Sequence, residues 1–283
     1  MKTSNPLKFL YKHRYLILRR LTQLTILGLY IAGNLWGWKI VQGNLSTSKL
    51  FDLIPLSDPY AVLQLIAAGS ILAVDVLIGA ALVLIFYAFV GGRAFCSWVC
   101  PINMVTDLAN WIRVKTGLHR EEWQLRPSRK VRYWIMGLGL VLSFLLMAPA
   151  FELISPIGMM HRGLIFGMGF GWTLILAVFL FDLFVTKNGW CGHFCPLGAF
   201  YSLISSKSAI RVKYNLDNCT LCMNCKNICP EKQVLWMIGK ESAVVTSGEC
   251  INCGRCIEVC NDDALNFGLR FTQIKKEEKG DVK

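Results

Sequence analysis

Long apolar runs alternate with short polar or charged segments along this chain of 283 residues. Four of the runs cover residues 21–41, 61–90, 133–150 and 164–185. Each is long enough to cross a bilayer as a helix. The pattern therefore predicts an α-helical membrane protein with four transmembrane helices inside a membrane domain over residues 21–210.

The charged segments between the runs predict how the helices are oriented. The first 20 residues carry six Lys or Arg and the stretch 93–132 carries eight, whereas the loops 42–60 and 151–163 carry one each. Cytoplasmic loops hold the excess of Lys and Arg. We therefore expect a basic cytoplasmic N-terminus over residues 1–20, a cytoplasmic C-terminus and a charged tail over residues 272–283.

Composition supports the membrane assignment and excludes one class of partner. Hydrophobic residues make up 54% of the chain and charged residues only 17%, against about a quarter in soluble domains. The net charge of +12 comes in blocks at the ends of apolar runs. We expect these blocks to be solvated anchors at the membrane surface, and no nucleic-acid partner.

The C-terminal part holds two cysteine runs of the form C-x2-C-x2-C-x3-C, at 219–229 and 250–260. This spacing is typical of two-cluster bacterial ferredoxins, in which the fourth cysteine of each run ligates the other cluster. Residues 211–271 are therefore predicted to form a cytoplasmic α+β ferredoxin-like domain with two [4Fe–4S] clusters. The crossing assigns Cys219, Cys222, Cys225 and Cys260 to one cluster, and Cys250, Cys253, Cys256 and Cys229 to the other.

Four further cysteines form a repeated C-x3-C-P motif at 96–101 and 191–196. The motif follows the second and the fourth apolar run, which indicates a duplicated two-helix hairpin with both motifs on the cytoplasmic side. Each proline suits the first turn of a new helix, so we expect helices over 101–113 and 196–205. The four thiols Cys96, Cys100, Cys191 and Cys195 admit three interpretations: a further iron–sulfur cluster, redox thiols, or apolar packing.

Few groups in the apolar runs can exchange protons. Asp75 lies near the middle of the run 61–90, and a carboxylate at that depth is a candidate proton acceptor. A structural hydrogen bond would explain it equally well. Glu152, His161 and Arg162 gather on the external side and are further candidates. No histidine lies within an apolar run, which argues against a haem-bearing membrane anchor.

Four spans, the two C-x3-C-P motifs and the terminal two-cluster module together resemble the NapH family of ferredoxin-type membrane proteins. MauN and the membrane part of NosR belong to the same wider group. The resemblance implies a multi-pass protein of the bacterial inner membrane that acts as a quinol dehydrogenase subunit, with menaquinol or ubiquinol as substrate. It also implies a periplasmic iron–sulfur partner of NapG type, multihaem or dihaem cytochromes, and nitrate reductase as the terminal acceptor.

Two other functions fit the same motifs. The chain could be a maturation factor that reduces a metalloenzyme or delivers metal to it. It could also be a membrane docking platform for a soluble cytoplasmic ferredoxin-type protein. Quinol-independent reduction would favour the first alternative, and partner binding that survives loss of the cluster ligands would favour the second.

Overall fold

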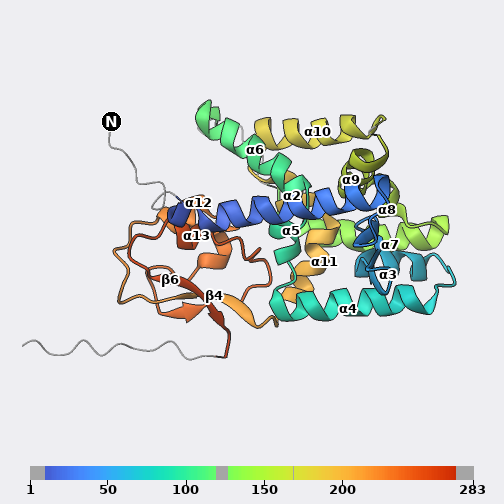
Figure 1. Cartoon of the computed structure of the whole chain (residues 1–283). Coiled ribbons are helices and arrows are strands. Elements are labelled where there is room, and N and C mark those ends of the chain that lie inside the picture. The colour runs from blue at the N-terminus through green and yellow to red at the C-terminus, as the bar shows by residue number, and fades with distance from the viewer. Residues whose placement is uncertain (1–9, 119–126, 168, 272–283) are drawn as a thin grey trace, which may run out of the picture.

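The computed structural model describes residues 10–118, 127–167 and 169–271. A bundle of helices and a smaller α+β part lie end to end, and the long helices of the bundle lie with their axes roughly parallel (Figure 1). These long helices are α2 (Arg14–Leu35), α4 (Val74–Val90), α7 (Val131–Leu146) and α10 (Gly171–Phe184). Residues 1–9 of the basic N-terminus expected over 1–20 lie outside the described residues, as does the tail expected over 272–283.

Helix α2 is the one helix in the described ranges that is long and apolar enough to cross a membrane. Helices α4, α7 and α10 are apolar but shorter, and the 17 residues of α4 span about 25 Å against ~30 Å of hydrocarbon. Their outer faces carry many exposed large apolar side chains, including Ile85, Phe89, Phe144, Leu145 and Phe184. A continuous apolar surface of this kind is rare on soluble monomers.

The structure differs from the prediction in two of the expected spans, 61–90 and 164–185. The first is a helical hairpin of α3 (Pro59–Ala67) and α4, and the second begins inside α9 (Pro156–Phe166), before α10. In the two turns, Gly69 has a φ of 73° and Gly167 a φ of 97°. Glycine adopts such a positive φ readily, and this conformation ends a helix. Asp75 consequently lies exposed in the first turn of α4, not in the middle of a span.

The two halves of the bundle repeat one local plan. Asp58 caps α3 and Ser155 caps α9, and in both helices proline occupies the first turn. A cysteine-bearing turn then follows the long helix, namely α5 (Ala94–Trp98) or the π-helical η2 (Trp190–Phe194). The helices α6 (Ile102–Lys115) and α11 (Pro196–Ser205) come next. The start predicted at Pro196 is confirmed, whereas α6 begins one residue after Pro101, which is its N-cap. A short α8 (Ala150–Ile154) joins α7 to α9.

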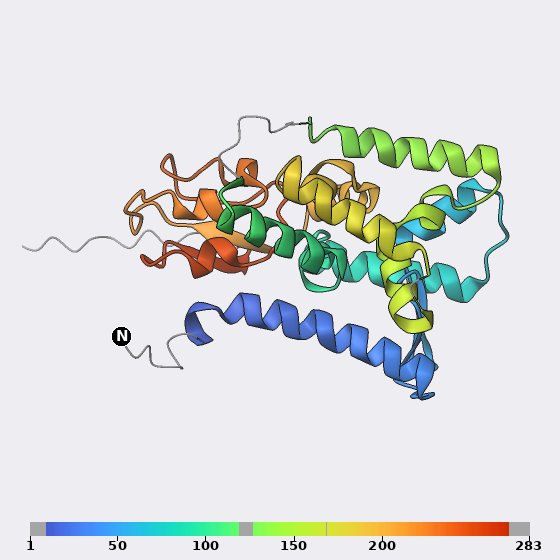
Figure 2. The same ribbon diagram turned by 90° about the horizontal axis from the view of Figure 1, so that it is seen from above.

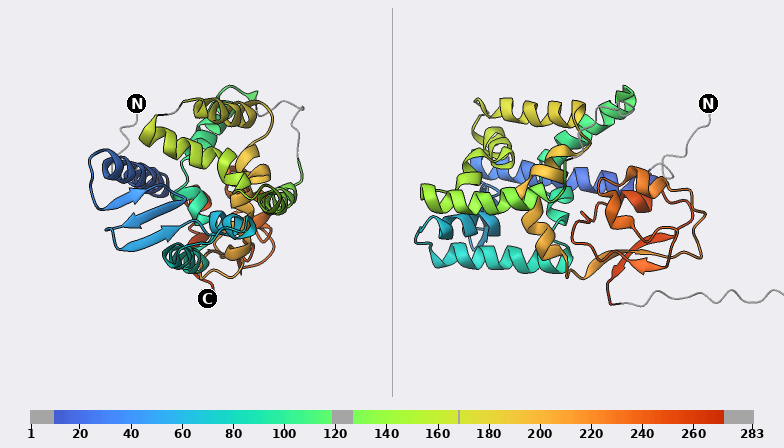
Figure 3. Two further views of the ribbon diagram at one scale, coloured as in Figure 1. Left: turned by 90° about the vertical axis from the view of Figure 1, so that its right-hand side faces the viewer. Right: turned by 180° about the vertical axis from the view of Figure 1, so that it is seen from behind.

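The expected external loop 42–60 is an antiparallel sheet. Its strands β1 (Val41–Gly43), β2 (Thr47–Leu50) and β3 (Ile54–Ser57) pair in the order β1-β2-β3. The sheet bridges α2 and α4 (Figure 3), with β1 against α2 and β3 against α4. Gly79 permits the close packing of β3, because a Cβ there would lie 3.0 Å from the Pro55 carbonyl.

The C-terminal part folds around a second antiparallel sheet in the order β5-β4-β6. Its strands are β4 (Ile210–Tyr214), β5 (Ala243–Val244) and β6 (Leu265–Leu269), and Val212 in β4 pairs with Phe267 in β6. Between the strands lie the short helices α12 (Asn224–Ile228), η3 (Lys232–Leu235) and α13 (Arg255–Glu258). The core of this part includes buried cysteines as well as aliphatic side chains.

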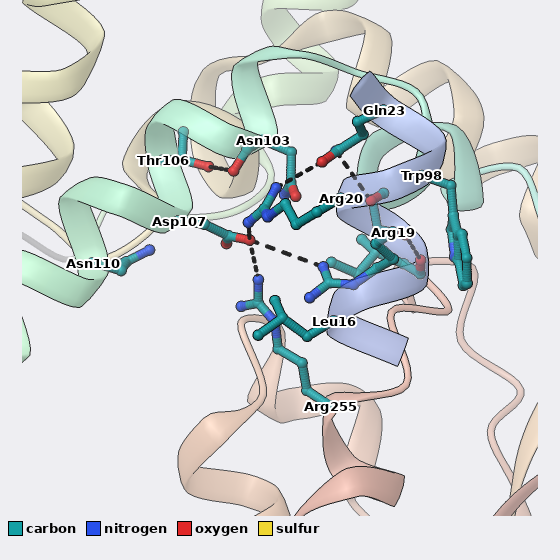
Figure 4. Close-up of polar contacts among 12 residues, drawn as sticks. Leu16, Arg19, Arg20, Gln23, Trp98, Asn103, Thr106, Asp107, Asn110 and Arg255 are labelled. Atoms are coloured by element: carbon teal, nitrogen blue, oxygen red, sulfur yellow. Dashed lines mark hydrogen bonds and ion pairs between the residues drawn. The ribbon is translucent and has the colours of Figure 1, made fainter. Parts of the chain in front are cut away.

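One carboxylate joins the bundle to the C-terminal part. Asp107 of α6 pairs with Arg20 of α2 and Arg255 of α13, and Arg19 of α2 lies 3.9 Å away (Figure 4). Figure 2 shows α2 along one side of the molecule, with its N-terminal end beside the C-terminal part. Asp107 therefore connects three segments that are distant in the sequence.

A second charged cluster lies on the other side of the junction. Arg93 donates to Glu231 at 2.7 Å, Arg129 pairs with the same carboxylate, and Arg132 pairs with Glu249. Arg93 and Arg132 are almost completely buried, as is Arg19. The prediction that each basic block is a solvated anchor is therefore wrong for these residues, because they pair with acidic groups of a docked domain.

We predict that Asp107→Asn weakens this junction. The substitution leaves Arg19, Arg20 and Arg255 without a carboxylate, and because these pairs are only partly buried the loss costs about 1 to 3 kcal/mol. Thermal unfolding of the detergent-solubilised protein should shift to lower temperature. The exposed Asp217→Asn is the matched control, and equal stability of the two variants would contradict a structural role for Asp107.

Candidate iron–sulfur centres

Four cysteines of the C-terminal part line one narrow cavity. Figure 1 places this region in the orange and red segment, at the end of the bundle. Its walls also include the apolar Val212, Val234 and Leu235 and the charged Glu231 and Arg255. The four cysteines, which are those that the crossing pattern assigns to one cluster, are Cys229, Cys250, Cys253 and Cys256.

The other predicted set also comes together. Cys225 is close enough to Cys219, Cys222 and Cys260 for their charges to influence it. Cys225 is buried at the start of α12, whereas Cys222 is exposed. This second set therefore lies nearer to solvent than the first.

The two cysteine loops share an unusual backbone. Leu221 and Met223 flank Cys222 with φ of 60° and 59°, and Asn252 and Gly254 flank Cys253 with φ of 48° and 73°. Left-handed conformations are costly for residues other than glycine, so the surrounding structure must hold them in place. The matching geometry turns each run around a common centre.

The two C-x3-C-P motifs meet inside the bundle in a single chamber. All four thiols line it, although Cys96 and Cys100 are separated from the other pair by almost a hundred residues of chain. The remaining lining is apolar and includes Phe95, Ile157 and Trp190. The sequence motif thus predicts a convergence that the fold produces, with the four sulfur atoms of Cys96, Cys100, Cys191 and Cys195 around one space.

Helix starts point hydrogen-bond donors at two of these sulfur atoms. Gly198 N–H donates to the Cys195 sulfur at 3.4 Å as α11 begins. The amides of Ile102 and Asn103, at the start of α6, lie against the Cys100 sulfur. Such donors stabilise a thiolate. Even with these donors, burial raises the pKa of Cys195 to about 12, so the free thiol is protonated and a poor nucleophile.

The donor set and the local charge fit anionic clusters. All twelve cysteines are free of disulfides. Buried guanidinium groups lie beside the thiols, with Arg19 close to Cys253 and Arg211 close to Cys250. Every side-chain nitrogen of Arg19 lacks a hydrogen-bond partner, and Arg211 has two such nitrogens. Four thiolates make an iron–sulfur cluster anionic overall, which would balance these buried cations.

The ligands of a four-iron cluster are spaced farther apart than the ligands of a single metal ion. Within residues 10–118, 127–167 and 169–271, no three His, Cys, Asp or Glu side chains converge closely enough for one ion. A four-iron cluster places each thiolate on a different iron atom, so its ligands stand apart by the width of the cluster. Two of the thiol sets, one in the C-terminal part and one in the bundle, each line a space of their own.

Direct contacts connect the chamber to the adjacent cluster cavity. Ser97 donates to the carbonyl of Ile251 at 2.6 Å, and Trp98 donates to the carbonyl of Asn252 at 3.0 Å. Arg93 donates to the carbonyl of Cys191 at 3.2 Å as well as to Glu231. The turn between Cys96 and Cys100 therefore rests on the loop between Cys250 and Cys253, which brings the two sites into contact.

The structure agrees only in part with the predicted placement of the residues that could exchange protons. The exposed position of Asp75 removes the burial on which its prediction rested, and its role in proton transfer stays a prediction. Glu152 and Arg162 do lie together, 3.9 Å apart, and His161 is buried against the ring of Tyr30. Sequence reasoning missed Asp58, although an Asp–Pro pair at the start of a helix is a recognisable capping signal.

We predict that Arg211→Gln lowers the reduction potential of one cluster. Removing a buried cation near Cys250 makes the added electron less favourable, by about 60 mV if the equilibrium constant falls tenfold. Redox titration followed by electron paramagnetic resonance measures this. The exposed Lys240→Gln is the control, and an unchanged potential in Arg211→Gln would contradict the proposed charge balance.

Comparison with protein families agrees with the two kinds of cysteine motif. A family model described as "4Fe-4S binding domain" matches residues 72–119 and again residues 164–215, so each copy contains one C-x3-C-P motif. A model described as "4Fe-4S dicluster domain" matches residues 211–261. The duplication and the ferredoxin-like module inferred from the sequence are both supported by these matches.

Comparison with individual proteins gives relatives along nearly the whole chain. The methylamine utilization ferredoxin-type protein MauN of Methylorubrum extorquens is 44% identical over 93% of this chain and 91% of its own. The ferredoxin-type protein NapH of Escherichia coli is 44% identical over 93% of this chain and 92% of its own. NapH of Haemophilus influenzae is also 44% identical, over 92% of both chains. No solved structure matches.

These matches confirm the resemblance drawn from the cysteine motifs. The relatives share both the ferredoxin-type description and the extent of the alignment, and the family models account for the two classes of motif. The chain therefore belongs to the NapH and MauN family of ferredoxin-type, 4Fe–4S electron-transport proteins.

Proposed function

We propose that the chain is a membrane electron-transfer subunit that oxidises menaquinol or ubiquinol and passes the electrons through iron–sulfur clusters to a periplasmic reductase chain. One observation carries the proposal: a chamber of four thiols inside the bundle contacts the cluster cavity of the ferredoxin-like domain. Such an arrangement gives electrons a path from the membrane part to the terminal domain.

The ligand sets follow from the placement of the thiols. Two [4Fe–4S] clusters would be held by the two ferredoxin-like sets, and a third iron–sulfur cluster by the chamber. Each cluster, when bound, accepts and releases one electron at a time. The protein keeps the chamber dry with Phe95 and Trp190, and supplies charge compensation through Arg93 and the helix starts. Ligand assignment to Cys96, Cys100, Cys191 and Cys195 is part of this proposal.

The membrane placement is proposed on the same basis. The four long helices run in parallel, and their outer faces are apolar. The buried and exposed arginines concentrate at the end that carries the ferredoxin-like domain. Together with the excess of Lys and Arg in the first 20 residues and in 93–132, this favours four spans with both termini and the ferredoxin-like domain in the cytoplasm.

The electron acceptors of the protein are proposed from the names of its relatives. Relatives named NapH support a route through a periplasmic NapG-type iron–sulfur subunit and multihaem or dihaem cytochromes to nitrate reductase. A relative with the same identity is named for methylamine utilization, so the terminal acceptor is the least constrained part of the proposal. A soluble cytoplasmic ferredoxin-type protein is a further candidate partner at the exposed cluster of Cys222.

We predict that menaquinol reduces the clusters of the purified protein. The protein is purified anaerobically in detergent and oxidised, and the loss of visible cluster absorbance is followed after menaquinol is added. Rapid bleaching supports quinol oxidation. Clusters that respond to dithionite but not to menaquinol would contradict it and favour the maturation function.

We predict that Cys195→Ser lowers the iron content by about four per chain, from about twelve to about eight. Serine caps a helix as well as the cysteine does, so α11 keeps its start while the ligand is lost. Iron is quantified per chain, with the protein concentration determined by amino-acid analysis. The exposed Ser206→Ala in the following turn is the control, and unchanged iron in Cys195→Ser would leave these thiols as redox thiols or packing groups.

A further inference from the structure

A cavity of about 230 Å³ lies beneath the bridging sheet, between α2 and α4. Most of its lining is apolar, including Leu29, Val41 and Val83. A few polar groups gather on the side of the sheet, namely Ser48, Ser57 and the carboxyl of Asp58. An apolar hollow with a small number of convergent polar groups is typical of small-molecule sites.

Asp58 is the acidic group of this cavity. Its carboxylate accepts from the Tyr60 amide at 3.1 Å, and its pKa is raised to about 7, mainly because burial removes it from water. The negative charge of Glu152 raises this pKa further. Helix capping alone does not require a carboxylate here, because Ser155 caps the corresponding helix of the second half.

An aromatic wall separates the cavity from the four-thiol chamber. Phe95 lines both spaces. Its ring stacks on Tyr201 at 5.1 Å, and Tyr201 contacts Tyr87 at 5.2 Å. Both tyrosines lie close enough to Asp58 on one side and to Cys96 on the other to interact electrostatically with each. A molecule in the cavity is therefore one aromatic layer away from the proposed cluster.

A wider apolar groove of about 590 Å³ adjoins the cavity. The two spaces share Ile26, Tyr87 and Val99. The groove runs between α2 and α4 and reaches Phe86, whose ring is more than half exposed on the outer face of α4. An apolar tail could lie in this groove while a polar head occupies the cavity.

Polar groups also lead from Asp58 toward the surface. The Asp58 amide donates to the carbonyl of Ser46 at 2.9 Å, and the Ser46 hydroxyl donates to Glu152 at 2.5 Å. Glu152 lies 3.9 Å from Arg162, whose side chain is 42% exposed. These contacts run through the Asp58 backbone, and they hold the Glu152 carboxylate, at the edge of solvent, near enough for its charge to act on the Asp58 carboxyl.

We propose that this cavity binds the head group of a quinol and that Asp58 is the general base that accepts its hydroxyl protons. The inference rests on the proposed function and names its site. Oxidation of one quinol to quinone breaks two O–H bonds. The Asp58 carboxylate takes the two protons in turn and releases each to the solvent edge beside Glu152, and the two electrons would leave singly across the Phe95 wall to an iron–sulfur cluster held by the four thiols of the chamber.

Asp58→Asn tests the base without removing the helix cap. The asparagine carbonyl oxygen can still accept from the Tyr60 amide, but the side chain cannot take a proton. We expect reduction of the clusters by decylubiquinol or menadiol to slow about a hundredfold. Reduction by dithionite and the iron content should not change. Asp52→Asn, an exposed carboxylate in the same sheet region, is the control, and a wild-type rate in Asp58→Asn would overturn the role.

The pH dependence gives an independent check of Asp58. The groups that face it are Glu152, Tyr60, Tyr87 and Tyr201. Because the base acts only when deprotonated, the ratio of wild-type rate to Asp58→Asn rate should rise as the pH passes through about 7. A ratio that stays constant from pH 5.5 to 8.5 would contradict proton transfer to Asp58.

Photolabelling tests the cavity separately from turnover. An azido-ubiquinone should label peptides of α2, β3 or α4 that line the cavity, in both the wild type and Asp58→Asn. Val83→Phe fills the cavity and should reduce this labelling at least tenfold, whereas Leu84→Phe adds the same ring to the exposed side of α4. Labelling elsewhere, or labelling that Val83→Phe leaves unchanged, would overturn the site.

The two assays distinguish failure of the inference from failure of the proposed function. A wild-type protein that binds the photolabel in the cavity but is not reduced by quinol would reject quinol oxidation and retain the binding site. A wild-type protein that quinol reduces, with no label in the cavity, would retain the proposed function and reject this site.

Discussion

Burial of charge at the junction between two different kinds of structure is the constraint on which this fold depends. A small domain rich in thiols must pack against the ends of apolar helices without water between them. Asp107, Glu231 and Glu249 pair with arginines from both sides and hold the two parts together. The arginines outnumber these acids, and anionic clusters would supply the missing negative charge. Charge pairing and cluster binding therefore support each other at one surface.

Duplication explains how four distant thiols reach one place. Each half contributes a capped short helix, a long helix and a cysteine-bearing turn, and each turn packs against the long helix before it. The halves differ where function would require it: the first helix of one half is capped by Asp58, and that of the other by Ser155. A symmetric scaffold thus carries an asymmetric chemical group, beside the chamber that both halves build.

Sequence spacing predicted the parts whose chemistry is local. The cysteine runs fix which thiols approach one another, and Pro196 marks a helix start at the residue where α11 begins. The turn at Gly69 was missed because the residues on both sides are apolar, so hydropathy merged a helical hairpin into one span. That error moved Asp75 to the wrong depth. Hydropathy does not reveal the burial of Arg132, because its partner Glu249 lies 117 residues away and hydropathy contains no information on such pairs.

The central claim is that a dry chamber of four thiols holds a third iron–sulfur centre between the membrane part and the ferredoxin-like domain. Electron cryomicroscopy of the anaerobically purified protein in a lipid nanodisc tests it most directly. We expect three compact, strong densities, one of them enclosed by Cys96, Cys100, Cys191 and Cys195. Two densities in the ferredoxin-like domain, with a chamber that is empty or closed by a disulfide, would contradict it.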